Sequence, residues 1–407
     1  MTLRTNPYSD TSEGRPRWSW LAIVVAVALL AAACGGDDDD TSAADDGTAV
    51  DASGDTADDA SDETSTDDAS TDGVDEADEA DEAEDSPAAI EPGVTVTLLT
   101  HDSFSVSDGL FDAFTLETGV EVEVVNGGDA GELVARAVLT AGDPEADVLF
   151  GIDNTFLQRG LDADLFEPHQ SPGLAAVPDE LELDPEFRVT PIDFGDVCVN
   201  YWVDEVDAAP TSLDDLTQPE FAASFVTQDP ETSSPGFAFL LATIATYGED
   251  GWEDYWTQLT AGGITVTPGW NDAYYGEFVA GGGDKALVTS YGSSPVAEVL
   301  FAADPIDEPP TGVLSDSCFR QIEFAGILAG TEHPAEAGAL IDFMLSETFQ
   351  ADIPLNMFVS PANAEVELPE LYAEHAAEVP EPLFLDPATI EANRNDWTER
   401  WAEIVLR

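Results

Sequence analysis

The stretch VTVTLLTHDSFSVSDGLFDAFTLETGVEVEVVNGGDAGELVARAVLTAGDPEADVLFGI, residues 94–152, decides the fold of this chain. Three runs within it, 94–99, 120–125 and 146–152, have the alternating or wholly apolar pattern of strands. The two segments between these runs place apolar residues three and four positions apart, which is typical of helices. Strands that alternate with helices predict parallel pairing through right-handed crossovers. We therefore expect a doubly wound α/β lobe to begin here.

The chain after residue 196 repeats this mixture. Strand-like and helix-like segments follow one another at 197–203, 237–247, 252–259, 264–266 and 286–290, and a strand-like run at 318–328 precedes closing helices at 335–345 and 387–405. The length is about twice that of one ordinary domain. We expect two α/β lobes, one from 93–196 plus 325–407 and one from 197–324, joined by two crossings. Ligands of open α/β sheets bind beyond the carboxyl ends of strands, so the interlobe cleft is the expected site.

The amino terminus has the pattern of an export signal. Arg4, Arg15 and Arg17 precede an apolar run from Trp18 to Ala33, which ends at Cys34. This run is shorter than the roughly 20 residues that span a bilayer. Residues 1–33 are therefore interpreted as a signal peptide, and Cys34 as a lipidated first residue of the mature chain. The expected location is the extracytoplasmic face of the cell membrane, held by the lipid anchor.

Residues 34–92 are strongly acidic. From Asp37 to Glu91 there are 24 acidic residues and no Lys or Arg. Such a segment buries too little apolar surface to fold, so we expect a disordered, extended tether. A calcium loop would need Gly-centred spacing that is missing here. The whole chain carries a net charge of −74, which excludes nucleic-acid binding, would attract a cationic ligand, and is also typical of adaptation to high salt.

Three cysteines are present, and one of them is the expected lipid site. Cys198 and Cys318 remain in an oxidising compartment, so a disulfide between them, near the two lobe crossings, is expected, with two buried thiols as the alternative. The four histidines are scattered along the chain, and no ligand spacing for a metal is present. The sequence predicts no metal site.

Five loop clusters combine small polar residues, Gly or Pro, and aromatics directly after expected strands. These clusters are His101–Phe104, Gly127–Ala130, Thr232–Gly236, Pro268–Tyr275 and Ser290–Pro295. Polar side chains after strands also cap helices, and capping is the interpretation we prefer for Asp102, Asp153 and Asn154.

Several strings in these clusters resemble those of a known family. THDSF (100–104), QDPETSSPG (228–236), VTPGWNDAYYGEF (266–278), TSYGSSP (289–295) and DPATIEANRNDWTERW (386–401) are similar, in the same order, to strings of the thiamine-binding proteins of ABC importers. The resemblance covers residues 94–407. It implies a type II periplasmic-binding-protein fold with a hinge and an interlobe cleft. It also implies a ligand, thiamine or its phosphates, and a monomer that delivers this ligand to ABC permease subunits without cofactor or catalysis.

The resemblance also implies which residues contact the ligand. Trp270 and Tyr291 correspond to ring-packing residues, and Asp129 and Ala130 to the contact loop of the first lobe. The hydroxyl and backbone contacts correspond to Ser233, Ser234, Gly292, Ser293 and Ser294. Further candidates are His101, which stands where a related protein has Tyr, together with Asp102 and Tyr274.

Three other functions remain open at this point. Adjacent tyrosines such as Tyr274 and Tyr275 hold ferric iron in related binding proteins, so an importer component for iron or another small cation is one alternative. A secreted hydrolase is another, although the chain has no G-x-S-x-G, G-x-x-x-x-G-K or H-E-x-x-H motif and few general bases. A structural surface protein would not explain aromatics gathered in loops after strands.

Overall fold

The structure, a computed structural model, describes residues 89–407. The expected signal peptide, the expected lipidation at Cys34 and all but the last few residues of the expected tether lie outside the described residues. In the part that is described, no helix is both long and apolar enough to cross a membrane.

One ten-stranded mixed sheet runs through the described residues, in the order β2-β1-β3-β9-β5-β8-β6-β7, with β10 paired to β5 and β4 to β9. β1 lies parallel to β2 and β3, and β6 lies parallel to β7 and β8. The expected parallel, doubly wound pairing is therefore confirmed at both ends of the sheet. The strands are β1 (Thr95–Thr100), β2 (Glu121–Asn126), β3 (Val148–Asp153), β4 (Phe166–Glu167), β5 (Thr190–Trp202), β6 (Phe225–Gln228), β7 (Thr265–Thr267), β8 (Leu287–Tyr291), β9 (Thr311–Leu328) and β10 (Ser360–Pro361).

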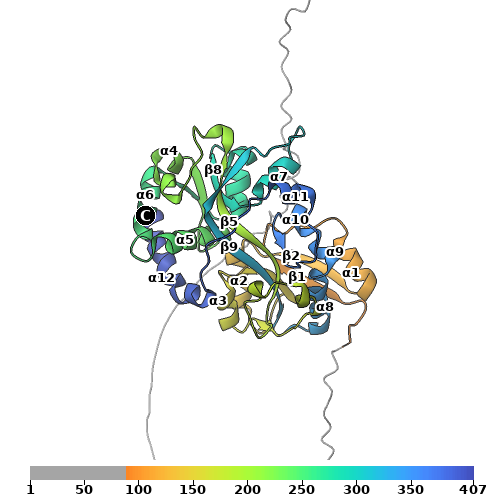
Figure 1. Cartoon of the computed structure of the whole chain (residues 1–407). Coiled ribbons are helices and arrows are strands. Elements are labelled where there is room, and N and C mark those ends of the chain that lie inside the picture. Colours follow the sequence, from red (N-terminus) through yellow and green to blue (C-terminus); the bar gives the residue numbers. More distant parts are fainter. Residues whose placement is uncertain (1–88) are drawn as a thin grey trace, which may run out of the picture. The chain divides into compact units, whose positions relative to one another are not determined.

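Helices cover the sheet in two groups, which Figure 1 shows as two lobes. The helices are α1 (Leu110–Thr118), α2 (Ala130–Leu139), α3 (Leu157–Asp162), α4 (Pro219–Ala222), α5 (Ser234–Tyr247), α6 (Trp252–Gly262), α7 (Ser294–Leu300), α8 (Pro334–Met344), α9 (Glu347–Gln350), α10 (Ile353–Asn356), α11 (Glu370–His375) and α12 (Pro387–Val405). The α/β class and the two-lobe arrangement expected from the sequence are confirmed.

The two longest strands, β5 and β9, connect the lobes. They pair antiparallel from Thr190↔Ala325 to Trp202↔Thr311 and lie side by side where the two lobes meet (Figure 1). Their pairing is interrupted between Val197 and Val199, opposite the segment 315–318 of β9. The Ser317 hydroxyl accepts a hydrogen bond from the Val199 amide in this interruption. A local break in an otherwise continuous ladder is a natural place for the strands to bend.

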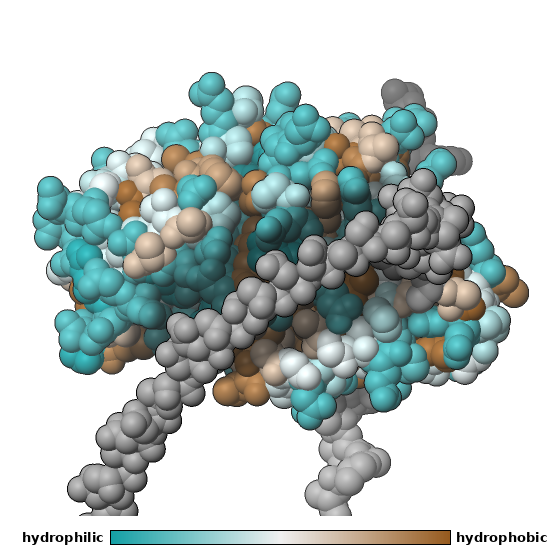
Figure 2. All heavy atoms as spheres, turned by 90° about the horizontal axis from the view of Figure 1, so that it is seen from below, coloured by the Kyte–Doolittle hydropathy of each residue, from teal (hydrophilic) through white to brown (hydrophobic). Residues whose placement is uncertain are grey.

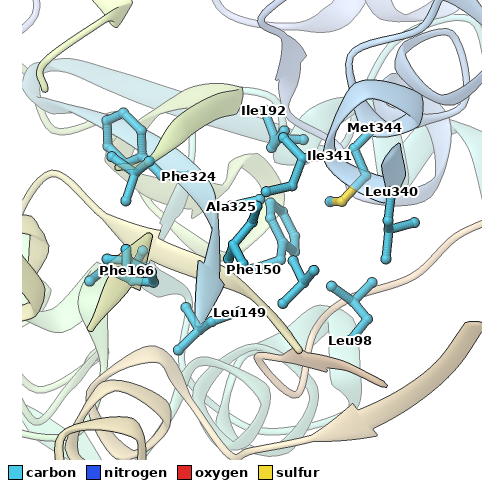
Figure 3. Packing of buried hydrophobic residues seen from close by; sticks show 14 of the residues in the cluster. Leu98, Leu149, Phe150, Phe166, Ile192, Phe324, Ala325, Leu340, Ile341 and Met344 are labelled. Carbon is cyan, nitrogen blue, oxygen red and sulfur yellow. The ribbon is translucent and has the colours of Figure 1, made fainter. Parts of the chain in front are cut away.

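Each lobe has its own apolar core. In lobe 1, side chains from β1, β3 and β9 meet helix α8, as Figure 3 shows for Leu98, Phe150, Ala325 and Ile341. In lobe 2, helices α5 and α6 pack on the sheet, and Trp256 is wholly buried there. Truncating one such tryptophan costs about 3–5 kcal/mol. Two separate cores allow each lobe to move as a rigid unit.

Helix α12 packs with lobe 2, whereas the sequence placed all of 325–407 in lobe 1. Its apolar residues Ile390, Trp397 and Trp401 are buried in the core of lobe 2, so the chain makes a third crossing after β10. Arg394 of α12 lies between the rings of Phe156 and Phe237, at 3.9 and 4.0 Å from their centroids. Phe156 belongs to lobe 1 and Phe237 to α5, so this arginine joins the two lobes.

Cys198 on β5 and Cys318 on β9 are joined by a disulfide, with their Cα atoms 4.2 Å apart. The bond lies at the interruption of the ladder. Beside it, Arg320 donates a hydrogen bond of 2.7 Å to Asp196. Both links join the two strands to each other, so they hold the crossing together without joining the bodies of the lobes.

Replacing both cysteines, in Cys198→Ala/Cys318→Ala, is expected to lower the free energy of unfolding by about 2–5 kcal/mol, because the bond closes a loop of 120 residues. Urea unfolding monitored by circular dichroism measures the change. The parent chain treated with a reductant is the control and should lose the same amount. An unchanged midpoint would contradict a bridge that forms in solution.

Candidate ligand-binding site

A cavity of about 350 Å³ lies between the lobes. This volume lies within the range of roughly 300–1,000 Å³ that holds small organic ligands. Lobe 1 contributes the loop after β1, the start of α2 and the segment after α10 to the wall. Lobe 2 contributes the start of α5, the loop after β7, the end of β8, and α7. Strand β9 contributes one side chain. Most of these segments follow strands, as expected for a sheet of this type.

The lobe 2 wall of the cavity is aromatic. The ring of Trp270 stacks on Tyr274 with centroids 4.9 Å apart, and it meets Tyr275 and Tyr291 edge to face. The Trp270 indole N–H donates to the Ser290 hydroxyl at 3.0 Å, which fixes the orientation of the ring. This wall therefore presents aromatic faces in a preset position.

Asp129 connects the two lobes across the cavity. It stands at the amino terminus of α2 in lobe 1, where its carboxylate accepts a hydrogen bond from the Ala130 amide. The same carboxylate accepts a second bond, 3.0 Å long, from the Trp270 backbone amide in lobe 2. Burial raises the pKa of Asp129 to about 6, although the Trp270 amide and the Ser233 hydroxyl favour the charged form. At neutral pH the carboxylate is ionised and holds Trp270 from the opposite lobe.

Two further contacts join the lobes. The Gly131 amide of α2 donates to the Thr232 carbonyl at 3.0 Å, and an added Cβ at Gly131 would lie 2.7 Å from that carbonyl oxygen. Glycine is required there by the close approach of the two backbones. The Ser293 hydroxyl, after β8, donates to the Phe358 carbonyl of lobe 1. These contacts describe a closed arrangement of the lobes.

The remaining surface of the cavity carries buried polar groups. Burial lowers the pKa of His101 to about 4, so its ring is neutral near pH 7. Nδ1 accepts from the Ser103 amide at 3.2 Å, which leaves the proton on Nε2, 3.7 Å from Glu323. Burial, and then the charges of Asp193 and Asp153, raise the pKa of Glu323 well above its usual range. The acidic side of the cavity lies in lobe 1, where β5 and β9 pair.

Most residues that the sequence singled out lie together in this cavity. The wall includes His101, Asp102, Asp129, Ala130, Ser234, Trp270, Tyr274, Tyr291 and Ser294. Three others lie behind it. Ser233 is buried beside Asp129, the Gly292 amide donates to the Asp196 carbonyl, and Ser293 bonds to Phe358. In this closed arrangement these three residues support the wall instead of forming it.

The sequence alone did not indicate several features of the cavity wall. Glu323 is the main one, and its signal was an acid within the apolar run CFRQIEFAGIL. Phe301 of the segment after α7 meets the ring of Phe358, with centroids 5.8 Å apart. Phe358 has a positive φ of 57°, which is uncommon for a non-glycine residue and is found at binding loops. Nothing in the local sequence indicates that conformation.

The chain is similar to one known protein family and to several of its members. Residues 143–381 match the family described as bacterial extracellular solute-binding protein. The thiamine-binding periplasmic protein of Escherichia coli K12 is 31% identical over 330 residues, which cover 79% of this chain and 96% of that protein. The protein of the same name from Brucella suis is 29% identical, and the match covers 77% of this chain and 92% of that protein.

A solved structure titled periplasmic thiamin binding protein has a TM-score of 0.69 and 27% identity, and the match covers 79% of this chain and 100% of that one. The fold and the interlobe cavity thus define a two-lobe solute-binding protein of the type II periplasmic-binding class. The family's established role is to bind a substrate for a transporter. The chain belongs to the bacterial extracellular solute-binding proteins and, among them, to the family of the thiamine-binding periplasmic proteins.

Replacement of Asp129 by Ala is expected to open the ligand-free protein, because the bond to the Trp270 amide is lost. Small-angle X-ray scattering should show a larger radius of gyration. Loss of a helix cap alone costs about 0.5–2 kcal/mol of stability, so a capping control is needed. Asp386→Ala removes the cap of α12 away from the cavity and should leave the radius unchanged. Equal radii for both variants and the parent would show that Asp129 does not hold the lobes closed.

Proposed function

We propose that this chain binds thiamine between its lobes, as a monomer on the extracytoplasmic face of the cell membrane, and delivers it to an ABC importer without chemical change. The observation that carries the proposal is the pairing of an aromatic wall in lobe 2 with acidic groups in lobe 1. The names of the related proteins support the same ligand.

Thiamine is a thiazolium cation joined to an aminopyrimidine, and the cavity suits both parts. The faces of Trp270 and Tyr291 can each hold a delocalised cation at about 0.5–2 kcal/mol. Hydroxyl and amide groups of Ser234, Ser294 and Asn271 lie on the wall and can bond to the pyrimidine edge. A phosphate ester would add negative charge opposite the wall carboxylates. Free thiamine is therefore the expected ligand in preference to its phosphates.

The net charge of the chain also favours a cation. The chain has 85 acidic and 11 basic residues, and the face seen in Figure 2 is predominantly hydrophilic. Such a surface attracts a cationic ligand over a distance of about 8–10 Å at physiological salt. The ligand is then concentrated near the protein before it makes any specific contact.

The ferric-iron alternative receives less support from the geometry. The Tyr274 hydroxyl donates to Glu298 at 2.5 Å, and Tyr275 is 61% exposed. Within residues 89–407 no group of three or more His, Cys, Asp or Glu side chains is arranged to hold a metal ion. The tyrosine pair forms one face of the aromatic wall, which explains both residues without a metal.

Thiamine is expected to raise the melting temperature of the purified full-length chain. At a hundredfold excess over the dissociation constant, binding adds about 2.7 kcal/mol of stability. Trp270→Ala should lose the shift, because it removes the face that holds the cation. Differential scanning fluorimetry measures both, and mass spectrometry should recover thiamine intact.

Trp202→Ala is the matched control. Trp202 is half-buried, belongs to lobe 2 and packs on Phe278 outside the cavity wall, so its variant should keep the thiamine shift. A parent chain that is not stabilised by thiamine or its phosphates has a different ligand. Conversion of thiamine during incubation would favour the hydrolase alternative.

We also propose that Cys34 carries the lipid that holds the chain at the membrane. The apolar run 18–33 before this cysteine and the acidic segment after it support the interpretation. A diacylglycerol supplies two buried acyl chains, which is the number that lasting anchorage requires. The acidic segment would let the binding lobes reach a permease from this anchor.

Cys34→Ala is expected to move the chain from the membrane fraction of expressing cells to a soluble extracytoplasmic fraction or the medium. Immunoblotting of the separated fractions measures this distribution. Thr41→Ala, seven residues on, is the control and should stay with the membrane. A Cys34→Ala chain that stays membrane-bound would show that another segment holds it there.

A further inference from the structure

Two carboxyl groups face each other at the acidic side of the cavity. Asp193 of β5 and Glu323 of β9 are direct partners in the antiparallel register. Glu323 lines the cavity with 7% of its surface exposed, and Asp193 behind it is 0% exposed. The ligand can therefore touch Glu323, while Asp193 is reached only through Glu323.

The hydrogen bonds of this pair are incomplete. Glu323 accepts from the Gln321 side-chain amide at 3.2 Å, whereas neither oxygen of Asp193 has an N–H or O–H donor among residues 89–407. Direct partners in an antiparallel pair point to the same face of the sheet with their Cβ atoms about 4.5–5.5 Å apart, so the two carboxyl groups are close enough to share a hydrogen bond. Ionised carboxylates only accept hydrogen bonds, so a bond between two of them requires one proton. Two neighbouring buried carboxylates cannot both stay ionised without a positive charge nearby.

The surroundings do not supply that charge. Arg320, three residues before Glu323, is paired with Asp196. Burial keeps the neighbouring His101 neutral. The other ionisable groups beside the pair are Asp129, Asp153, Tyr291 and Tyr372, none of which carries a positive charge. The Arg394 guanidinium interacts with Glu391 and Asp153 instead. In the empty cavity the pair thus lacks a cation of its own.

We propose that Asp193 and Glu323 form the counter-anion that selects a cationic ligand, holding one shared proton in the empty cavity and releasing it to solvent when the cation binds. The inference rests on the proposed function and names two residues that determine its specificity. On binding, the O–H bond of the pair breaks, its proton passes to water, and both carboxylates remain ionised beside the ligand. The exchange is balanced, because one proton leaves the pair for water as one cation enters the cavity.

The sign of the pH dependence follows from this exchange. Burial raises the pKa of both carboxyls, so the proton is held at neutral pH in the absence of ligand. A rise in pH removes the proton that competes with the cation and strengthens binding by up to about tenfold per pH unit. A neutral ligand of similar shape gains nothing from an ionised pair and should bind with no such dependence.

Infrared spectroscopy of the ligand-free, full-length chain at pH 7 tests the shared proton without any ligand. The parent should show the carbonyl band of a protonated carboxylic acid in the difference spectrum against Glu323→Gln and against Asp193→Asn. In each variant the new amide can donate to the remaining carboxylate, which then ionises. Asp316→Asn removes an exposed acid from the same strand and should keep the band. Identical spectra for the parent and both pair variants would overturn the proposal.

Calorimetry with thiamine tests the exchange itself. Titrations in two buffers with different ionisation enthalpies should show release of about one proton per thiamine at pH 7. Glu323→Gln should bind thiamine about 10- to 100-fold more weakly and release no proton. Asp316→Asn should match the parent. The neutral aminopyrimidine half of thiamine should bind the parent and Glu323→Gln alike.

The outcomes separate this inference from the proposed function. Thiamine binding with no proton release, or with equal affinity in Glu323→Gln, would overturn the inference and leave the function standing. A parent chain that binds no thiamine but shows the infrared difference would overturn the function alone. If Glu323→Gln does not fold, Asp193→Asn takes its place in these tests. A variant is used only if it melts near the temperature of the parent.

Discussion

The structure depends on the pairing of β5 with β9. These strands join the two cores, and their ladder is interrupted where the lobes meet. The disulfide and the Asp196–Arg320 ion pair lie at the same place and link the strands directly. Motion at this crossing is therefore restricted to bending, because the two strands cannot separate. The cavity lies against it, so a small bend at the strands changes the distance between the cavity walls.

The closing contacts are few and each is modest. The amide bonds to Asp129 and to the Thr232 carbonyl, with the hydroxyl bond from Ser293, are the kind of interaction that contributes about 0.5–1.5 kcal/mol, or about 1.5–3 when one partner is charged. The loss of conformational entropy when the lobes become ordered, and the free-energy cost of excluding water from a charged cavity, oppose these contacts. A balance of this size lets the empty protein open and close, and it leaves a ligand enough influence to decide between the two forms.

The sequence predicted the class, the two lobes and most of the cavity, because those features depend on local patterns. Strand runs such as 94–99 and 146–152 matched β1 and β3 to within two residues. The position of α12 could not be predicted, since its tryptophans fit either core and only tertiary packing chooses. Glu323 was missed because its role depends on Asp193, 130 residues away in the chain and opposite it in the sheet. The register between two distant strands cannot be predicted from the sequence of either strand alone.

The two lobes supply different contacts to the ligand, which explains why a ligand would close the protein. The aromatic faces belong to lobe 2, and the carboxyl pair belongs to the lobe 1 ends of β5 and β9. A cation touches both only when the lobes are together. Moving a population from 1:99 to 99:1 takes about 5.5 kcal/mol of differential affinity. One cation–π contact at about 2 kcal/mol and one charge-assisted bond from the ligand's amino group to Glu323 at about 1.5–3 kcal/mol supply most of that value. A neutral ring of the same shape would keep the stacking and lose the charge, and so would leave the protein largely open.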